Sequence, residues 1–346
     1  MSWGPLSGSS SQVISSSVPA TPLIFEVDTR NTGTSNDDQF TMPTTGSYDV
    51  DWGDSSTESI SSAAPTHTYA SEGVYDITIS NPSAAFDPLK FANGGDKAKL
   101  TDIKQWGNQN LWTSSGFSTA FWSCTNLDIS ATDIPDTSAV TSFYFAFYNC
   151  TSLTTTNEFE TDSVTNMAYA FSNCTSLTTG PTLSTGSVTD FEKMFRGCTS
   201  LTSVPAYDLT SATTTFDMFA NCTTITSFPA GLLSSAPTNL TNMSQMFNNC
   251  ESVTSFPSGW NFSRATNISG IFGDCTDLAS LPSGWDFDAV TNPSNMVRSC
   301  TSLTSFPAYS FDAATSYYFL LYGCSGITTL PDFPDADNVT NFGYAF

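Results

Sequence analysis

The stretch that decides the fold is SVTNMAYAFSNCTSLT, residues Ser163–Thr178, because close copies of it recur along most of the chain. Each copy carries one cysteine, and successive cysteines lie 26, 24, 24, 24, 28, 25, 25 and 24 residues apart. They are Cys124, Cys150, Cys174, Cys198, Cys222, Cys250, Cys275, Cys300 and Cys324. A fixed period of roughly 20 to 50 residues is typical of solenoids, so we expect a stack of short coils.

The residues before each cysteine predict a short helix. With the cysteine as position 0, apolar residues recur at −7, −4 and −3, as in Met167, Ala170 and Phe171. This spacing would place them on one face of an α-helix. Position −8 holds Ser, Thr, Asn or Asp in eight repeats. These residues cap helix N-termini, so the helix would begin there.

The residues after each cysteine predict a short strand. In a threonine-rich run, Leu177 stands at position +3 and Pro181 at +7. Threonine suits the part-buried surface of a strand, and proline is confined to strand ends and edges. Stacked repeats would then align their strands into a parallel sheet.

The repeat pattern resembles the BspA-type leucine-rich repeats of bacterial surface proteins, and FANGGDKAKLTDIKQWG (Phe91–Gly107) resembles the segment that precedes those repeats. The resemblance covers about residues 86–346. It implies an α/β leucine-rich-repeat solenoid, with a short strand plus a short helix per repeat of about 25 residues, and it implies adhesion or ligand binding. Residues 83–112 would be the N-terminal cap and 113–346 the repeats, of which the last is incomplete.

The region before the repeats differs in kind. It contains GSYDVDWGDSS (Gly46–Ser56) and PTHTYASEGVYDITI (Pro65–Ile79), and alternation over Val74–Ile79 predicts a half-buried strand. The W-G-D turn followed by H-T-Y resembles PKD-type immunoglobulin-like modules. That resemblance implies a small β-sandwich over residues 21–82, which would space or present other domains. Residues 1–20, rich in Ser and Gly, are interpreted as an arm.

Composition narrows the partners. Nine Lys and Arg residues face 32 Asp and Glu residues, which gives a net charge of −23. Such a chain is repelled by phosphate backbones, so nucleic acid is a poor partner. No apolar run has the length of a membrane span. The first residues lack the basic and apolar regions of a secretory signal, which favours a protein that reaches the outside as part of a particle.

The cysteines have metal, disulfide and packing interpretations. No C-x-x-C motif occurs and His67 is the only histidine, so zinc sites are not expected. Nine is an odd number, so complete intramolecular pairing is excluded. We expect each cysteine to be a small buried hydrophobe stacked on its equivalents. No motif points to catalysis, and the sequence predicts that the protein is not an enzyme and needs no cofactor.

One acidic cluster is a candidate metal site. It surrounds the W-G-D turn and consists of Asp49, Asp51, Asp54 and Glu58. Carboxylates at this spacing could bind Ca²⁺. The alternative, which we favour, is a solvated loop whose carboxylates cap turns.

Recurring aromatic residues after the prolines are candidate ligand-binding residues. They are Tyr207, Trp260, Trp285 and Tyr309. They could form a stripe of stacking platforms for sugar rings or for a protein. The alternative, which we favour, is burial beside the apolar residues two positions on, because strand alternation would place both sets on the same side.

These observations predict a non-enzymatic structural and recognition protein displayed on a surface. The first setting is a phage virion component, either a capsid decoration or a fibre, that mediates adhesion or host binding. The alternative is a BspA-like bacterial cell-surface adhesin. Expected partners are a protein or glycan on a host or neighbouring surface. Other virion or envelope proteins would bind through the N-terminal arm or the uncapped C-terminal end.

Overall fold

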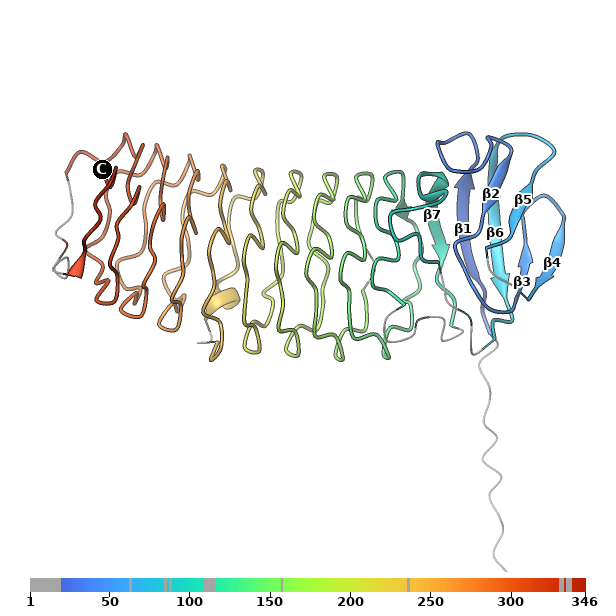
Figure 1. Cartoon of the computed structure of the whole chain (residues 1–346), viewed down its shortest axis with the longest axis horizontal. Coiled ribbons are helices and arrows are strands. Elements are labelled where there is room, and N and C mark those ends of the chain that lie inside the picture. The colour runs from blue at the N-terminus through green and yellow to red at the C-terminus, as the bar shows by residue number, and fades with distance from the viewer. Residues whose placement is uncertain are drawn as a thin grey trace, which may run out of the picture.

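The computed structural model describes residues 20–61, 64–83, 86, 89–108, 112, 116–156, 158–234, 237–329, 333 and 338–346. A β-sheet unit lies at one end, and a long row of stacked coils extends from it (Figure 1). The predicted arm, residues 1–20, lies outside the described residues except for its last residue. The described residues contain no helix with the length and hydropathy that a bilayer crossing requires.

The N-terminal unit consists of two sheets. The strands are β1 (Leu23–Asp28), β2 (Gln39–Thr41), β3 (Tyr48–Asp51), β4 (Thr57–Ile60), β5 (Thr66–Thr68), β6 (Val74–Ser80), β7 (Leu100–Gln105) and β8 (Asp128–Ile129). One sheet has the order β4-β3-β6-β1-β7-β8, and β2 pairs with β5 in the other. The rings of Phe25 on β1 and Phe40 on β2 are buried 6.2 Å apart and join the two sheets. The strand predicted over Val74–Ile79 is confirmed as part of β6.

The large sheet continues into the coils. β7 pairs antiparallel with β1 and parallel with β8, which belongs to the first coil. The predicted boundary between residues 82 and 83 therefore falls between β6 and β7, two strands of the same sheet. Shared backbone hydrogen bonds fix the first coil against the N-terminal unit.

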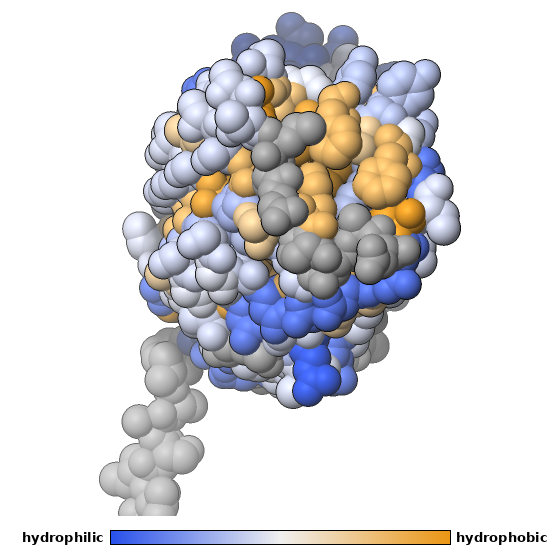
Figure 2. Space-filling view, turned by 90° about the vertical axis from the view of Figure 1, so that its left-hand side faces the viewer, coloured by the Kyte–Doolittle hydropathy of each residue, from blue (hydrophilic) through white to orange (hydrophobic). Residues whose placement is uncertain are grey.

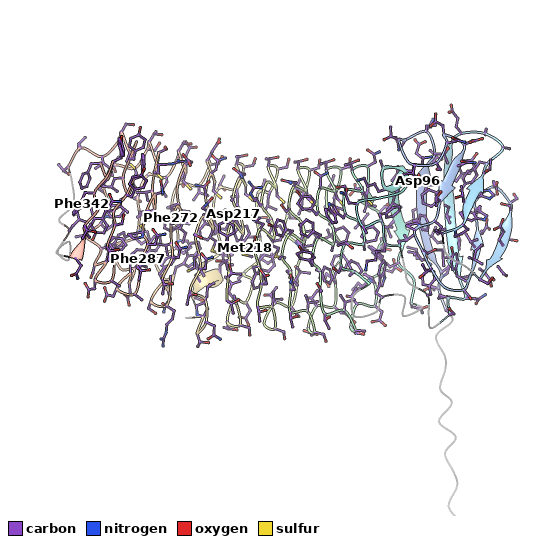
Figure 3. The ribbon with its side chains drawn as sticks, in the orientation of Figure 1. Asp96, Asp217, Met218, Phe272, Phe287 and Phe342 are labelled. Atoms are coloured by element: carbon purple, nitrogen blue, oxygen red, sulfur yellow. The ribbon has the colours of Figure 1, made fainter. Side chains whose placement is uncertain are left out.

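A buried pair of charged residues strengthens this junction. Asp96 and Lys99 are fully buried (Figure 3 labels Asp96). The Asp96 carboxylate accepts hydrogen bonds from the backbone N–H groups of Thr34, Ser35 and Thr41 at 2.7–3.0 Å. Burial raises the pKa of Asp96, but the hydrogen bonds from Ser35 and Thr41 and the Lys99 charge outweigh it, so the pKa lies below its usual value. The network ties the β1–β2 connection to the segment that leads into β7.

The predicted α/β leucine-rich-repeat solenoid is wrong in its secondary structure. The described parts of the coils contain neither the predicted α-helix nor the predicted strand in each repeat. The described helices are two short 3₁₀ turns, η1 (Lys97–Lys99) and η2 (Ala230–Leu233). Beyond β8, pairing between coils consists of isolated parallel bridges, such as Thr179 with Ser203. Most of each coil is a chain of turns.

Hydrogen bonds between neighbouring coils replace the expected helix. In the coil that ends at Cys150, the N–H groups of Ala146 and Cys150 close turns onto the carbonyls of Phe143 and Phe147, at 2.9 and 3.2 Å. The intervening N–H of Phe147 instead donates to Ala170 in the next coil at 2.8 Å. An α-helix needs each N–H to reach back four residues, and here alternate N–H groups point to another coil. The backbone is satisfied, but only in a stack.

Left-handed residues make this alternation possible. Positions −5 and −1 have positive φ in every complete coil, for example 55° at Phe145 and 60° at Asn149. A positive φ ends a right-handed helix, and Asn adopts it more readily than most residues do. The side chains at −8 close turns rather than cap helices. Asn166 Oδ1, for example, accepts the N–H of Ala168 at 2.8 Å.

Two ladders of side chains form the core of the stack. Phenylalanines at −3 stack nearly parallel from coil to coil, with centroids 5.2–5.9 Å apart from Phe121 to Phe272. The cysteines at position 0 are all free and buried, so the packing interpretation is confirmed. In eight of them the thiol donates a hydrogen bond to the backbone carbonyl of the −3 residue in the preceding coil. Cys150, for example, donates to Phe121 at 3.0 Å.

Candidate functional site

The four aromatic residues predicted to bind a ligand are core residues. Tyr207, Trp260, Trp285 and Tyr309 are only 2–5 % exposed. The rings of Trp260, Trp285 and Tyr309 stack on one another in order, 6.4 and 6.3 Å apart. They present no stacking platform to a ligand, which corrects that prediction in favour of burial.

Hydrogen bonds explain why these positions carry Tyr or Trp. In three of the four rings the polar end donates a hydrogen bond to the proline carbonyl of the preceding coil. Tyr207 donates to Pro181 at 2.9 Å, and Trp285 donates to Pro257 at 3.3 Å. Trp260 Nε1 has no such partner among the described residues. It follows the long repeat of 28 residues that contains η2, so the preceding coil has a different shape.

The acidic residues near the W-G-D turn do not converge. Asp49 accepts hydrogen bonds from Ser59 and Asn81, and Asp51 caps Gly53. Glu58 lies opposite Val50, so it is on the other face of the sheet from Asp49 and Asp51. No group of three potential metal ligands comes together in the described part of the chain. The predicted Ca²⁺ site is therefore not assembled.

The fourth carboxylate, Asp54, belongs to a structural cluster. His67 Nε2 lies 2.9 Å from Asp54 Oδ2, and the imidazole stacks on Trp52 at 4.7 Å. Ser56 also donates to Asp54. Burial raises the pKa of Asp54, but the hydrogen bonds from Ser56 and His67 lower it further, to about 2. Ser56 and Asp54 both lie next to Nε2 of His67. In a catalytic triad the serine and the carboxylate instead bind the two different nitrogens of the imidazole.

A different set of side chains forms the most distinctive surface. We call it the turn face and define it as the side chains at positions −6, −5 and −2 of the coils. Positions −5 and −2 flank the buried pair at −4 and −3, so they point away from the core. This face has two aromatic patches with a polar section between them.

The first aromatic patch lies on the coils nearest the N-terminal unit. It consists of Trp122, Tyr144, Phe145, Tyr148 and Tyr169. Phe145 is at its centre, 4.5 Å from Tyr169, 4.7 Å from Trp122 and 4.8 Å from Tyr148 between ring centroids. Tyr144 is 41 % exposed and the other four are partly buried. Rings from three successive coils thus form one continuous apolar surface.

Backbone strain sets this patch apart. Phe145 and Tyr169 have φ of 55° and 59°, values that are unfavourable for bulky residues. At the same position, Asn295 or Gly270 adopts this φ at lower cost. Strained residues concentrate at functional sites. The presence of Phe145 and Tyr169 at −5 therefore favours a binding role for this surface.

Charged residues border the first patch. Lys193 Nζ lies 4.9 Å from the Tyr169 ring and 4.8 Å from the Phe216 ring, and it pairs with Glu192 at 2.9 Å. Beside it, Asp217 Oδ2 lies 3.4 Å from Arg196 Nε. Burial raises the pKa of Asp217 more than Arg196 lowers it, and Oδ1 of Asp217 has no hydrogen-bond partner among the described residues.

The second aromatic patch lies at the far end of the stack. It consists of Tyr318, Phe319, Tyr322 and Tyr344. Phe319 stacks on Tyr344 at 5.0 Å, and three of the four rings are 39–66 % exposed. Figure 2 looks onto this end and shows hydrophobic side chains on the end surface as well, where Phe342 and Phe346 are exposed.

The sequence contained a signal for the turn face. At −5 and −2, the residue type changes from coil to coil, while −3 and 0 stay apolar. Variable positions within a regular repeat face solvent, and aromatic residues there are the exposed ones. The aromatic residues after the prolines recur from coil to coil because they are part of the core. Their recurrence is therefore not a signal of ligand binding.

Comparison with known proteins identifies a family. A search of curated proteins finds no match. A family model described as "Mycoplasma protein of unknown function, DUF285" matches residues 115–231 and 225–310, which together cover more than half of the chain and include the first eight cysteines. Because this family model covers more than half of the chain, the chain belongs to the DUF285 family.

Proposed function

We propose that the protein is a non-enzymatic recognition protein displayed on a surface, and that it binds a glycan or protein through the first aromatic patch. The observation that carries this proposal is the continuous group of partly exposed rings centred on Phe145. Aromatic rings supply large contact areas at low entropic cost, and exposed apolar patches mark interaction sites. The stack beneath supplies a rigid support.

We also propose that the two parts of the chain are related to modules of known surface proteins. The repeats resemble those of BspA-type surface proteins, and the N-terminal unit with its W-G-D turn resembles a PKD-type module. The pairing of β7 with both β1 and β8 supports a presenting role, because it attaches that unit to the stack in a fixed orientation.

A paired mutant tests the binding function. Trp122→Ser combined with Tyr148→Ser removes two rings from the first patch. Ile134→Ser is the matched control, since Ile134 is 50 % exposed and lies off the turn face. The readout is binding of the full chain to an array of immobilised glycans and to purified host-envelope proteins. We expect the double variant to lose at least tenfold in affinity and the control to bind as the parent does. Equal binding by all three proteins would overturn the proposal.

Two settings remain proposals, a phage virion and a bacterial cell surface. The family match to proteins described as Mycoplasma proteins favours the second. Mass spectrometry of purified particles and of host envelopes separates them. The protein should appear in only one of the two fractions at stoichiometric amounts.

A further inference from the structure

The polar section of the turn face contains a notch that two glycines create. In the coil that ends at Cys275, Gly270 occupies position −5 and Gly273 occupies −2. This coil therefore has no side chain at either position. A cavity of about 190 Å³ lies there, and its lining residues are Gln245, Asn248, Ser269, Gly270, Asn295 and Arg298. We call it the glycine notch.

The backbone favours glycine at Gly270 but does not require it. Its φ is 64°, and position −5 has positive φ throughout the stack, with 55° at Gln245 and 58° at Asn295. Other coils therefore carry a side chain here, although a Cβ atom at Gly270 would lie 3.3 Å from Gln245 Cγ. The consequence of glycine is the missing side chain, which leaves space between Gln245 in the preceding coil and Asn295 in the following one.

The second glycine allows a neighbour to lie over the floor of the notch. A Cβ atom at Gly273 would lie 2.8 Å from Asn248 Nδ2. With glycine there, Asn248 donates to the Gly273 carbonyl at 3.1 Å. The floor is thus made of backbone and one fixed amide.

The walls carry polar groups that the protein leaves unused. The side-chain amides of Gln245 and Asn295 and the hydroxyl of Ser269 make no hydrogen bond to any residue that the structure describes. Amides and hydroxyls both donate and accept hydrogen bonds. Arg298 adds further donors, and its guanidinium pairs with Asp274 at 2.5 Å.

We infer that the glycine notch binds a single neutral sugar residue of a glycan. The free donors and acceptors suit a ligand with several hydroxyl groups. Asp274 neutralises Arg298, so an anionic ligand would meet a carboxylate as well as a guanidinium. The cavity is smaller than the roughly 300–1,000 Å³ of sites for drug-sized molecules, so it suits one ring rather than an extended ligand. It is separate from the first aromatic patch and does not depend on the function proposed there.

The test fills the notch. Gly270→Gln introduces the side chain that Gln245 carries at the equivalent position. Thr119→Gln places the same side chain at −5 in the first coil, outside both the notch and the first aromatic patch, and is the matched control. Binding of glucose, galactose, mannose and N-acetylglucosamine to the full chain is measured by saturation-transfer NMR, with N-acetylglutamate as an anionic probe. We expect saturable millimolar binding of at least one sugar, a loss of at least tenfold in Gly270→Gln, and no change in Thr119→Gln.

Other outcomes overturn the inference. It fails if none of the four sugars binds, if N-acetylglutamate alone binds, or if Gly270→Gln binds sugar as the parent does. Circular dichroism and the melting temperature show whether Gly270→Gln keeps its fold. If it does not, Gln245→Gly replaces it, because glycine already occupies −5 in the next coil. Removing the Gln245 amide should then weaken sugar binding at least fivefold, and unchanged binding would again refute the site.

Discussion

The cysteines show how one residue type serves the stack at the level of single atoms. Each thiol is small enough to repeat at every coil, and in eight cases it donates to a backbone carbonyl. Burial raises the pKa of Cys198 and Cys275 to about 12, so these thiols stay protonated near neutral pH. A protonated, buried thiol is inert, because the thiolate is the reactive form.

This chemistry predicts the accessibility of the thiols. We expect the native protein to react with none of its nine cysteines when treated with a thiol-specific disulfide reagent at pH 8. In denaturant, all nine should react. Release of chromophore measures both numbers. Fast reaction of several thiols in the native protein would mean that the buried cysteines become exposed by local unfolding of the coils.

Asp217 is the residue whose ionisation opposes folding most clearly. Its side chain is 8 % exposed, and burial raises the pKa of its carboxyl. An acid with a raised pKa in the folded state favours folding when protonated. That contribution is complete below the unfolded pKa and declines as pH rises through the folded pKa. At neutral pH the charge is therefore a cost, although Arg196 offsets part of it.

Asp217→Asn should stabilise the protein at neutral pH. Asparagine removes the buried charge and suits the positive φ of 56° at this position. We expect a gain of about 1 kcal/mol at pH 7 that disappears below about pH 4. Denaturant titrations at both pH values measure it. Destabilisation at pH 7 would show that the ion pair with Arg196 outweighs the cost of burial.

At the scale of elements, the sequence predicted which side chains are buried but not the path of the backbone. Phe143, Ala146, Phe147 and Cys150 are all fully buried, as the helical spacing implied. That spacing reports which residues face the core, and a series of turns satisfies it as well as a helix does. Hydrogen bonds to the next coil involve residues about 24 positions away, which local patterns do not reveal. The signal for turns was Asn149 and its equivalents at −1, where asparagine favours positive φ.

The same limit applies to the candidate sites. Strand alternation favoured burial of the recurring aromatic residues over ligand binding, and the structure places all four in the core. The glycine notch could not be seen without knowing that −5 and −2 lie on the same face. By contrast, turn capping by the carboxylates near the W-G-D turn was favoured from the sequence, and Asp51 does accept the N–H of Gly53 two residues on.

The junction between the N-terminal unit and the coils depends on Asp96. The carboxylate itself is fully buried and accepts hydrogen bonds from three part-buried N–H groups, which lose this partner when it is removed. Asp96→Ala should therefore cost about 3–5 kcal/mol. Asp76→Ala is the control, because Asp76 is 53 % exposed and pairs with Lys104 at the surface, where the loss should be below about 1 kcal/mol. Chemical denaturation followed by tryptophan fluorescence gives both values, and equal losses would contradict the assigned role.

The whole molecule behaves as a one-dimensional array, because each coil bonds mainly to its two neighbours. Three successive spacings of 24 residues around Cys150, Cys174, Cys198 and Cys222 make these coils equivalent in length. Their phenylalanines stack at 5.4–5.6 Å with planes within 9° of parallel. Any one of them should therefore be able to pack on the coil after next.

Deletion of one full coil, residues 175–198, should leave a folded protein. Removing 24 residues brings Cys174 next to the coil of Cys222 in the same register, so both ladders continue. Stability should fall slightly, because the array loses one nearest-neighbour interface, and the denaturant m-value should fall in proportion to the surface lost. Deletion of residues 175–186, half a coil, is the matched control. It places Ser203 at −7 and Thr210 at 0, where the core has apolar residues, so it should abolish cooperative unfolding. If both deletions unfold the protein, the coils are not interchangeable and the array description is wrong. If both fold, register between coils is not what holds the stack together.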